Sequence, residues 1–152
     1  MKLRGSGTFP EHRYPADPWR LIEAEPDLAN LGVTETLFAV GNGYIGMRAN
    51  PSEGRDAHSH GTYLNGFHET WPIHHAESAV AFAKTGQTIV NAPDAKLMKL
   101  YVDDEPLRVG QADLDSYERV IDFAAGRSWR ELVWRTPSGK LIRIFSSRMV
   151  SM

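Results

Sequence analysis

Alternating apolar and polar residues are the clearest pattern along this chain. In Lys96–Val102, Met98 and Leu100 fall on one side and Lys99 on the other. Because residues two apart lie on the same face of a strand, this pattern predicts a half-buried β-strand. Short runs rich in β-branched and aromatic residues recur between turn formers and predict further strands. The predicted strands are Trp19–Glu23, Thr36–Val40, Tyr44–Ala49, Thr62–His68, Lys96–Val102, Leu107–Val109, Tyr117–Phe123, Trp129–Arg135 and Leu141–Val150.

Helical patterns are scarce in the sequence. The best candidate is Ala76–Lys84, which is short for a helix that must hold without tertiary support. Many short strands joined by turns favour an antiparallel sandwich or barrel over alternating strand–helix units. The predicted fold class is therefore all-β, as an antiparallel β-sandwich over residues 19–152. Residues 1–18 carry Pro10, Pro15 and Pro18 and are expected to form an irregular N-terminal arm.

The last predicted strand has apolar residues on both faces over Leu141–Phe145, as a central strand does. No further strand follows it in the sequence, so its outer edge would present unpaired N–H and C=O groups. We expect this edge to be covered, either by further polypeptide or by a partner. A homo-oligomer formed through the exposed sheet edge is the predicted assembly.

The composition limits the classes of function. A chain of 152 residues favours one domain. It has no cysteine, which excludes a disulfide framework, a thiolate zinc site and a cysteine nucleophile. A net charge of -2 argues against nucleic-acid binding, and no apolar stretch is long enough for a membrane span. No signal peptide is recognisable, so we expect a cytoplasmic location.

The glycines of Gly41–Gly46 match the spacing of a dinucleotide-binding fingerprint. That fingerprint needs a following helix whose N-terminus holds the pyrophosphate, and here the chain soon reaches Pro51. A tight turn between two strands is therefore the favoured interpretation. Glu35 precedes this segment and Arg48 follows it, and we hypothesise that they pair across the hairpin and fix the shape of the loop.

Other polar groups give no defined catalytic or metal site. The six histidines lack the spacing of a zinc site, so solvated loop residues are the favoured interpretation. Carboxylates two apart would share a strand face and could flank a sugar, yet most such acids are surface charge, which is the favoured interpretation. These pairs are Glu23 with Glu25 and Asp113 with Asp115. We assign no catalytic residue, no metal ligand and no cofactor.

Several aromatic side chains could stack on a sugar ring, although aromatic residues on strands more often belong to the core. Trp71, beside Pro72 in a predicted loop, is the best functional candidate among the tryptophans. With the glycine turn and its flanking arginine, the aromatic candidates make up the predicted substrate-framing set. This set is Asn42, Tyr44, Arg48, Tyr63 and Trp71.

Several segments, in this order, resemble signatures of glycoside hydrolase family 65, which holds maltose, trehalose and kojibiose phosphorylases and related hydrolases. The likeness covers nearly everything from Trp19 onward. The segments are Glu35–Arg48, Thr62–Phe67, Val90–Pro93, Tyr117–Asp122, and Trp134–Lys140 with Arg148–Ser151.

This resemblance implies part of a galactose-mutarotase-like supersandwich, the N-terminal domain of a longer enzyme. The family's catalytic glutamate and phosphate-binding loop lie in a following helical barrel that this sequence does not include, so the chain alone is expected to be inactive. The complete enzyme would act on an α-linked glucose disaccharide such as trehalose or maltose, with inorganic phosphate as co-substrate if it is a phosphorylase. Two alternatives stay open: a free-standing carbohydrate-binding module, or an inactive product that only self-associates.

Overall fold

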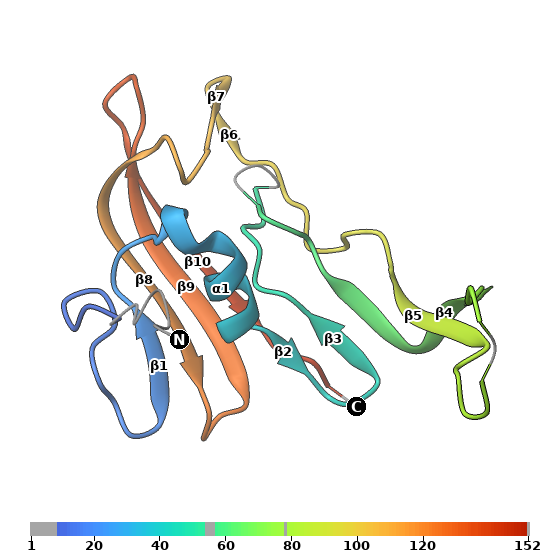
Figure 1. Ribbon diagram of the computed structural model, residues 1–152. Helices are drawn as coiled ribbons and strands as arrows, with labels where there is room; N and C mark the ends of the chain where they lie inside the picture. Colours follow the sequence, from blue (N-terminus) through green and yellow to red (C-terminus); the bar gives the residue numbers. More distant parts are fainter. Residues whose placement is uncertain (1–8, 54–56, 78, 152) are drawn as a thin grey trace.

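Antiparallel β-strands make up most of the regular structure. The computed structural model describes residues 9–53, 57–77 and 79–151. A first four-stranded sheet has the order β1-β8-β9-β10 (Figure 1). Its strands are β1 (Arg20–Glu23), β8 (Asp113–Asp122), β9 (Arg127–Arg135) and β10 (Leu141–Arg148).

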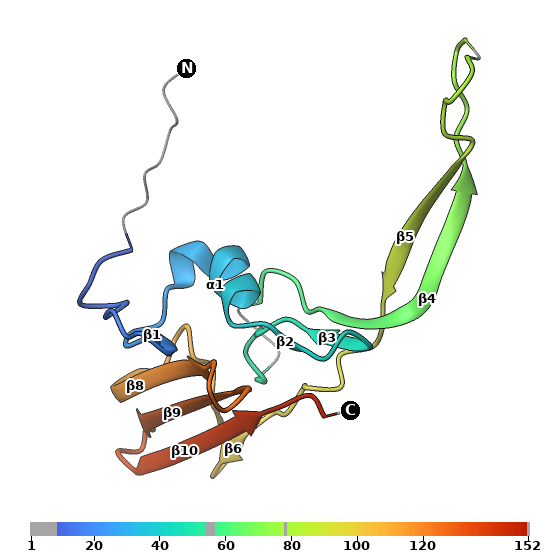
Figure 2. The same ribbon diagram turned by 90° about the horizontal axis from the view of Figure 1, so that it is seen from below.

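A second four-stranded sheet has the order β2-β3-β4-β5. Its strands are β2 (Val40–Gly41), β3 (Ile45–Met47), β4 (Thr62–Pro72) and β5 (Thr85–Asn91). The far ends of β4 and β5 continue away from the body as a two-stranded arm (Figure 2). The predicted all-β, antiparallel fold class is confirmed.

A short helical segment covers the inner face of the first sheet, on the same side as β2 and β3 (Figure 2). It consists of the 3-10 helix η1 (Leu28–Asn30) and of α1 (Leu31–Leu37). The predicted strand Thr36–Val40 is therefore wrong except for Val40, which begins β2. The buried face of the segment is formed by Thr34, Glu35 and Phe38, and two of these are polar, so the sequence shows no apolar helical period.

The helix predicted at Ala76–Lys84 is wrong. Apart from Ser78, which lies outside the described residues, this segment forms bends and turns between β4 and β5. Ala81 has a φ of 73°, which no α-helix accommodates. The strand β5, which follows at once, was not predicted.

The predicted strands Lys96–Val102 and Leu107–Val109 are shorter or absent in the structure. The first contains only β6 (Tyr101–Val102), which pairs with β7 (Glu105–Pro106). The two residues between them, Asp103 and Asp104, both have positive φ, as a tight two-residue hairpin turn requires. The chain after β7 leaves the ribbon and enters the core.

The apolar core is small and lies on the inner face of the first sheet. Its larger cluster contains Leu107, Val109, Leu132 and Trp134, all buried. A second cluster beneath α1 contains Phe38, Ala49 and Ile121. The inner face of β9 continues from the apolar Leu132 and Trp134 to the polar Ser128 and Arg130, which are also buried.

The strand β10 lies at the edge of the first sheet and pairs with β9. Its burial alternates: Ile142 and Ile144 are half-buried, whereas Leu141 and Phe145 are exposed. The strand thus has the predicted free edge but only one inward face. Of the predicted N-terminal arm, residues 1–8 lie outside the described residues, and residues 9–18 contain turns without helix or strand. Neither helix in the described chain is long and apolar enough to cross a membrane.

Leu132→Ala should lower the free energy of unfolding by about 2–5 kcal/mol, because it leaves a cavity in the larger core cluster. Leu141→Ala is the matched control, since Leu141 is 55% exposed at the edge of the same sheet. Its effect should stay below about 1 kcal/mol. Urea unfolding of both variants measures the difference, and equal losses would contradict the assignment of the core.

Candidate functional site

The glycine segment forms the turn of the β2–β3 hairpin. Val40 pairs with Met47 and Gly41 with Gly46. The side-chain oxygen of Asn42 accepts hydrogen bonds from the backbone N–H groups of Tyr44 and Ile45, both at 2.9 Å. The backbone N–H groups of Tyr44 and Ile45 therefore already have an acceptor and are not available to a phosphate. The segment after the turn is the strand β3 and not a helix. The predicted turn is confirmed, and no phosphate-binding helix is present here.

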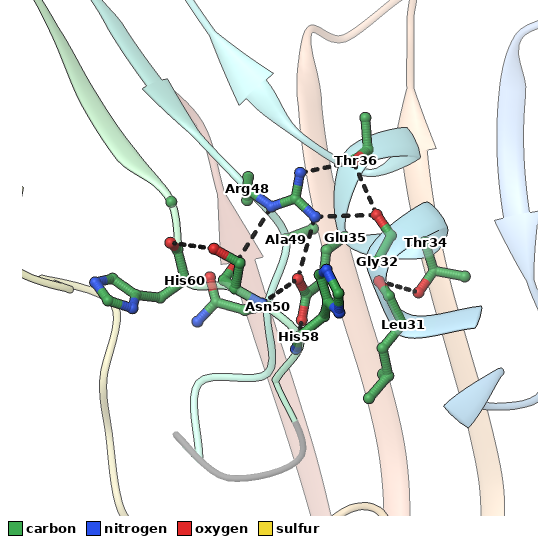
Figure 3. A network of polar contacts seen from close by, with 12 residues as sticks. Leu31, Gly32, Thr34, Glu35, Thr36, Arg48, Ala49, Asn50, His58 and His60 are labelled. Atoms are coloured by element: carbon green, nitrogen blue, oxygen red, sulfur yellow. Dashed lines mark hydrogen bonds and ion pairs between the residues drawn. The ribbon is translucent and has the colours of Figure 1, made fainter. Parts of the chain in front are cut away.

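Glu35 and Arg48 pair, as hypothesised, and Figure 3 shows their surroundings. Arg48 Nη2 lies 3.2 Å from Glu35 Oε2, and the carboxylate is fully buried. The geometry differs from the hypothesis because Glu35 belongs to α1 rather than to a strand. The pair therefore joins the helix to the end of β3 and does not cross the hairpin.

The Glu35 carboxylate also fixes the loop that leads into β4. The backbone N–H of His58 donates to Oε1 at 2.7 Å, and that of Ser59 donates to Oε2 at 3.1 Å (Figure 3). The backbone carbonyl of Glu35 accepts a hydrogen bond from Ala49. Both carboxylate oxygens are thus satisfied inside the protein, so Glu35 is suited to a structural role and not to proton transfer with a ligand.

The Arg48 guanidinium connects three segments. Nη1 donates to Thr36 Oγ1 at 2.7 Å, Nη2 donates to the Gly32 carbonyl at 3.0 Å, and Nε donates to the Ser59 carbonyl at 3.2 Å. Arginine suits this position because its planar fork presents several donors in fixed directions. The helix, the loop and β3 are held in one arrangement by a single side chain.

An open hollow of about 470 Å³ lies beside this network. Arg48 and Tyr63, two members of the predicted substrate-framing set, both line it. They also meet over Gly61, where an added Cβ would lie 2.4 Å from Arg48 Cδ and 2.8 Å from Tyr63 Cε2. The other lining residues are Ala29, Asn30, Gly32, Val33, His58 and Ser59.

The remaining three predicted residues lie elsewhere. Asn42 and Tyr44 are in the hairpin turn, where the Asn42 amide donates to the Ser151 carbonyl at 2.8 Å. Trp71 is in β4, not in a loop as predicted, and lies opposite Gly86 of the arm. Its ring covers that glycine so closely that an added Cβ would lie 2.4 Å from Trp71 Cε2. The five residues therefore do not form one site.

A row of polar side chains on the inner face of the first sheet was missed by the sequence analysis. Glu23, Arg119, Arg130 and Ser146 are consecutive neighbours across the four strands. Glu23 was interpreted as surface charge, which is wrong, since it is buried beside Arg119 Nη2 at 2.7 Å. The sequence alone does not show that Glu23 and Arg119 lie opposite each other. Only the register between β1 and β8 does.

Two further contacts stabilise this row. The Arg119 guanidinium lies 4.2 Å from the centre of the Phe38 ring, a cation–π contact with α1. Burial raises the pKa of the Tyr117 phenol, so this hydroxyl stays protonated and donates to Glu23 Oε2 at 3.0 Å. Within the described ranges, no three histidine, aspartate or glutamate side chains are grouped closely enough to hold a metal ion.

Glu35→Gln should lower the free energy of unfolding by about 2–4 kcal/mol, because it leaves the Arg48 guanidinium without its buried counter-charge. Glu118→Gln is the matched control: Glu118 is an exposed glutamate on β8, and its loss should change stability by no more than about 0.5 kcal/mol. Denaturant unfolding compares the two. A neutral effect of Glu35→Gln would show that the network does not hold the fold.

Comparison with known proteins now places the chain. The sequence profile of the "Glycosyl hydrolase family 65, N-terminal domain" matches residues 21–152. An α,α-trehalose phosphorylase of Thermoanaerobacter brockii is 38% identical over 143 residues, covering 91% of this chain and 18% of its own length. An uncharacterized glycosyl hydrolase of Mycobacterium tuberculosis (strain H37Rv) is 40% identical over 142 residues, covering 93% and 18%.

A solved structure is also similar to this chain. It is named "Putative kojibiose phosphorylase from human microbiome" and superposes with a TM-score of 0.79 at 25% identity, covering 90% of this chain and 18% of that one. The chain thus spans less than one fifth of the length of the proteins it matches. It belongs to glycosyl hydrolase family 65, and its residues match the N-terminal domain of that family.

Proposed function

We propose that this chain is the non-catalytic sandwich domain of a family 65 α-glucoside phosphorylase that splits an α-linked glucose disaccharide with inorganic phosphate. The observation that carries the proposal is the family match over residues 21–152. Trehalose is the favoured substrate, since the trehalose phosphorylase is 38% identical and the kojibiose phosphorylase structure 25%. Maltose is the second candidate, and hydrolysis with water is the alternative reaction.

The geometry supports a structural role for this domain. Inverting cleavage of a glycosidic bond needs a carboxylic acid that is protonated and can reach the leaving oxygen. The buried carboxylates of the described chain are instead held by cations: Glu23 by Arg119, Asp27 by Arg13, Glu35 by Arg48 and Glu53 by Arg130. Because these carboxylates are already engaged inside the protein, they suit scaffolding better than contact with a leaving group.

The same proposal extends to the setting of the enzyme. It includes a cytoplasmic location, no cofactor beyond phosphate as co-substrate, and a homo-oligomer built on the free edge of β10. Any contact of this domain with sugar would come from the hollow beside Arg48 and Tyr63, because the other candidates lie apart from it.

A chimeric enzyme tests the proposal. The matching segment of the Thermoanaerobacter brockii trehalose phosphorylase is replaced by this chain, and release of glucose 1-phosphate from trehalose and phosphate is measured. The chimera should turn over trehalose, whereas the same enzyme lacking the segment and this chain alone should not. Turnover by the chain alone, or a folded chimera without activity, would contradict the proposed role.

Calorimetric titration of this chain with trehalose and maltose separates the scaffold from a carbohydrate-binding module. We expect no saturable heat, because the polar groups of Arg48 beside the hollow are already engaged. Saturable binding that is lost in Tyr63→Ala and kept in Tyr101→Ala would favour the module instead. Tyr101 is the matched control because it lies exposed on the separate β6–β7 ribbon.

A further inference from the structure

Three carboxylate–cation pairs and one further arginine lie on the inner face of the first sheet and in the loops packed against it. Each carboxylate among them has a cation of its own: Glu23 has Arg119, Glu53 has Arg130 and Asp94 has Lys96. The further arginine is Arg148 of β10, which leaves the group with one excess positive charge.

Among the described residues, the hydrogen-bond partners of Arg148 are all neutral, and the carboxylates of Glu53 and Asp94 act on it only from further away. Its two Nη atoms donate to the Asn50 carbonyl, each at 3.3 Å, and Nη2 also donates to Ser52 Oγ at 2.5 Å. Burial lowers the pKa of Arg148, and the positive charge of Arg130 lowers it further. A half-buried guanidinium without a paired carboxylate is costly, because more distant charges repay its desolvation only in part.

Two polar atoms next to Arg148 are also without a partner in the described part of the chain. They are Nε of Arg130 and Oδ1 of Asn50, and both are buried. The Arg130 side chain is only 10% exposed, and its Nη atoms are directed to Glu53. The Nε–H of Arg130 is therefore a buried donor that has no acceptor among the described residues. Native structures rarely leave such a donor unsatisfied.

A cavity of about 40 Å³ lies where these groups meet, between the first sheet and the helical segment. Its lining includes Asn50, Arg130, Ser146 and Arg148. The carboxylates of Glu23, Asp27 and Glu35 line it as well, and each of them is paired with an arginine. About 10–15 Å³ of such volume is enough for one water molecule, so this space takes a small ion together with water. The water is needed to donate to Asn50 Oδ1, an acceptor that an anion cannot satisfy.

We propose that this cavity is a binding site for a small monovalent anion such as chloride, held by Arg148 and by the free Nε of Arg130. A monovalent anion cancels the single excess charge and accepts from the unpaired donor. Water alone would meet the hydrogen-bonding need but not the charge. A phosphate dianion would reverse the sign of the charge in a small, largely buried space. The site is independent of the proposed phosphorylase role.

Thermal unfolding of this chain in chloride tests the site, with gluconate replacing chloride at constant ionic strength. The unfolding temperature should rise with chloride and saturate, by roughly 3 °C when chloride exceeds its dissociation constant about fivefold. Line broadening in chloride NMR should saturate over the same range. An unfolding temperature that does not depend on chloride would overturn the proposal.

Arg148→Gln should abolish both chloride effects, because it removes the excess charge. Arg143→Gln should keep them: Arg143 lies on the same strand with its side chain exposed and paired to Glu131. Equal chloride responses in the two variants would overturn the site. Should Arg148→Gln fail to fold, the unmodified chain still decides the question, and bromide-soaked crystals would locate the anion beside Arg148 or away from it.

Discussion

Pairing between buried glutamates and arginines from distant segments is the interaction on which this fold depends. Glu23 joins β1 to Arg119 of β8, and Glu35 joins α1 to Arg48 after β3. Glu53 reaches Arg130 on β9 in the same way. The removal of one partner from such a pair costs about 3–5 kcal/mol, because the other charge stays buried and uncompensated. The apolar clusters are small, so these pairs specify how the helix, the loops and the two sheets fit together.

The same constraint explains the chemistry of the domain. A buried carboxylate whose oxygens already bind an arginine and other protein donors has no free oxygen to offer to a leaving group. Three arginines in the family-like segments, Arg48, Arg119 and Arg148, all contact the interior of the fold. The sequence signature of this domain therefore marks the residues that hold its shape.

The sequence could predict those parts of the structure in which polarity follows burial. The strands β9 and β10 start within two residues of their predicted positions because their inward residues alternate with outward ones. The helix α1 was not predicted, because its buried residues are the polar Thr34 and Glu35 and give no apolar helical period. Glu23 was taken for surface charge for the same reason: a carboxylate shows its burial only when the register brings an arginine opposite to it. The Glu35–Arg48 pair was predicted, yet its helical origin was not.

The arm formed by β4 and β5 gives Trp71 a structural role that the sequence analysis did not foresee. A two-stranded ribbon that projects from the body is marginal in water unless its side chains support it. Trp71 gives this support by lying across the arm on Gly86, and near the tip the rings of His75 and Phe82 lie 4.9 Å apart. An aromatic ring over a cross-strand glycine replaces packing that the glycine cannot provide. Trp71 is thus distinctive because the arm requires it, and a role in sugar contact would have to use the part of its ring that Gly86 leaves free.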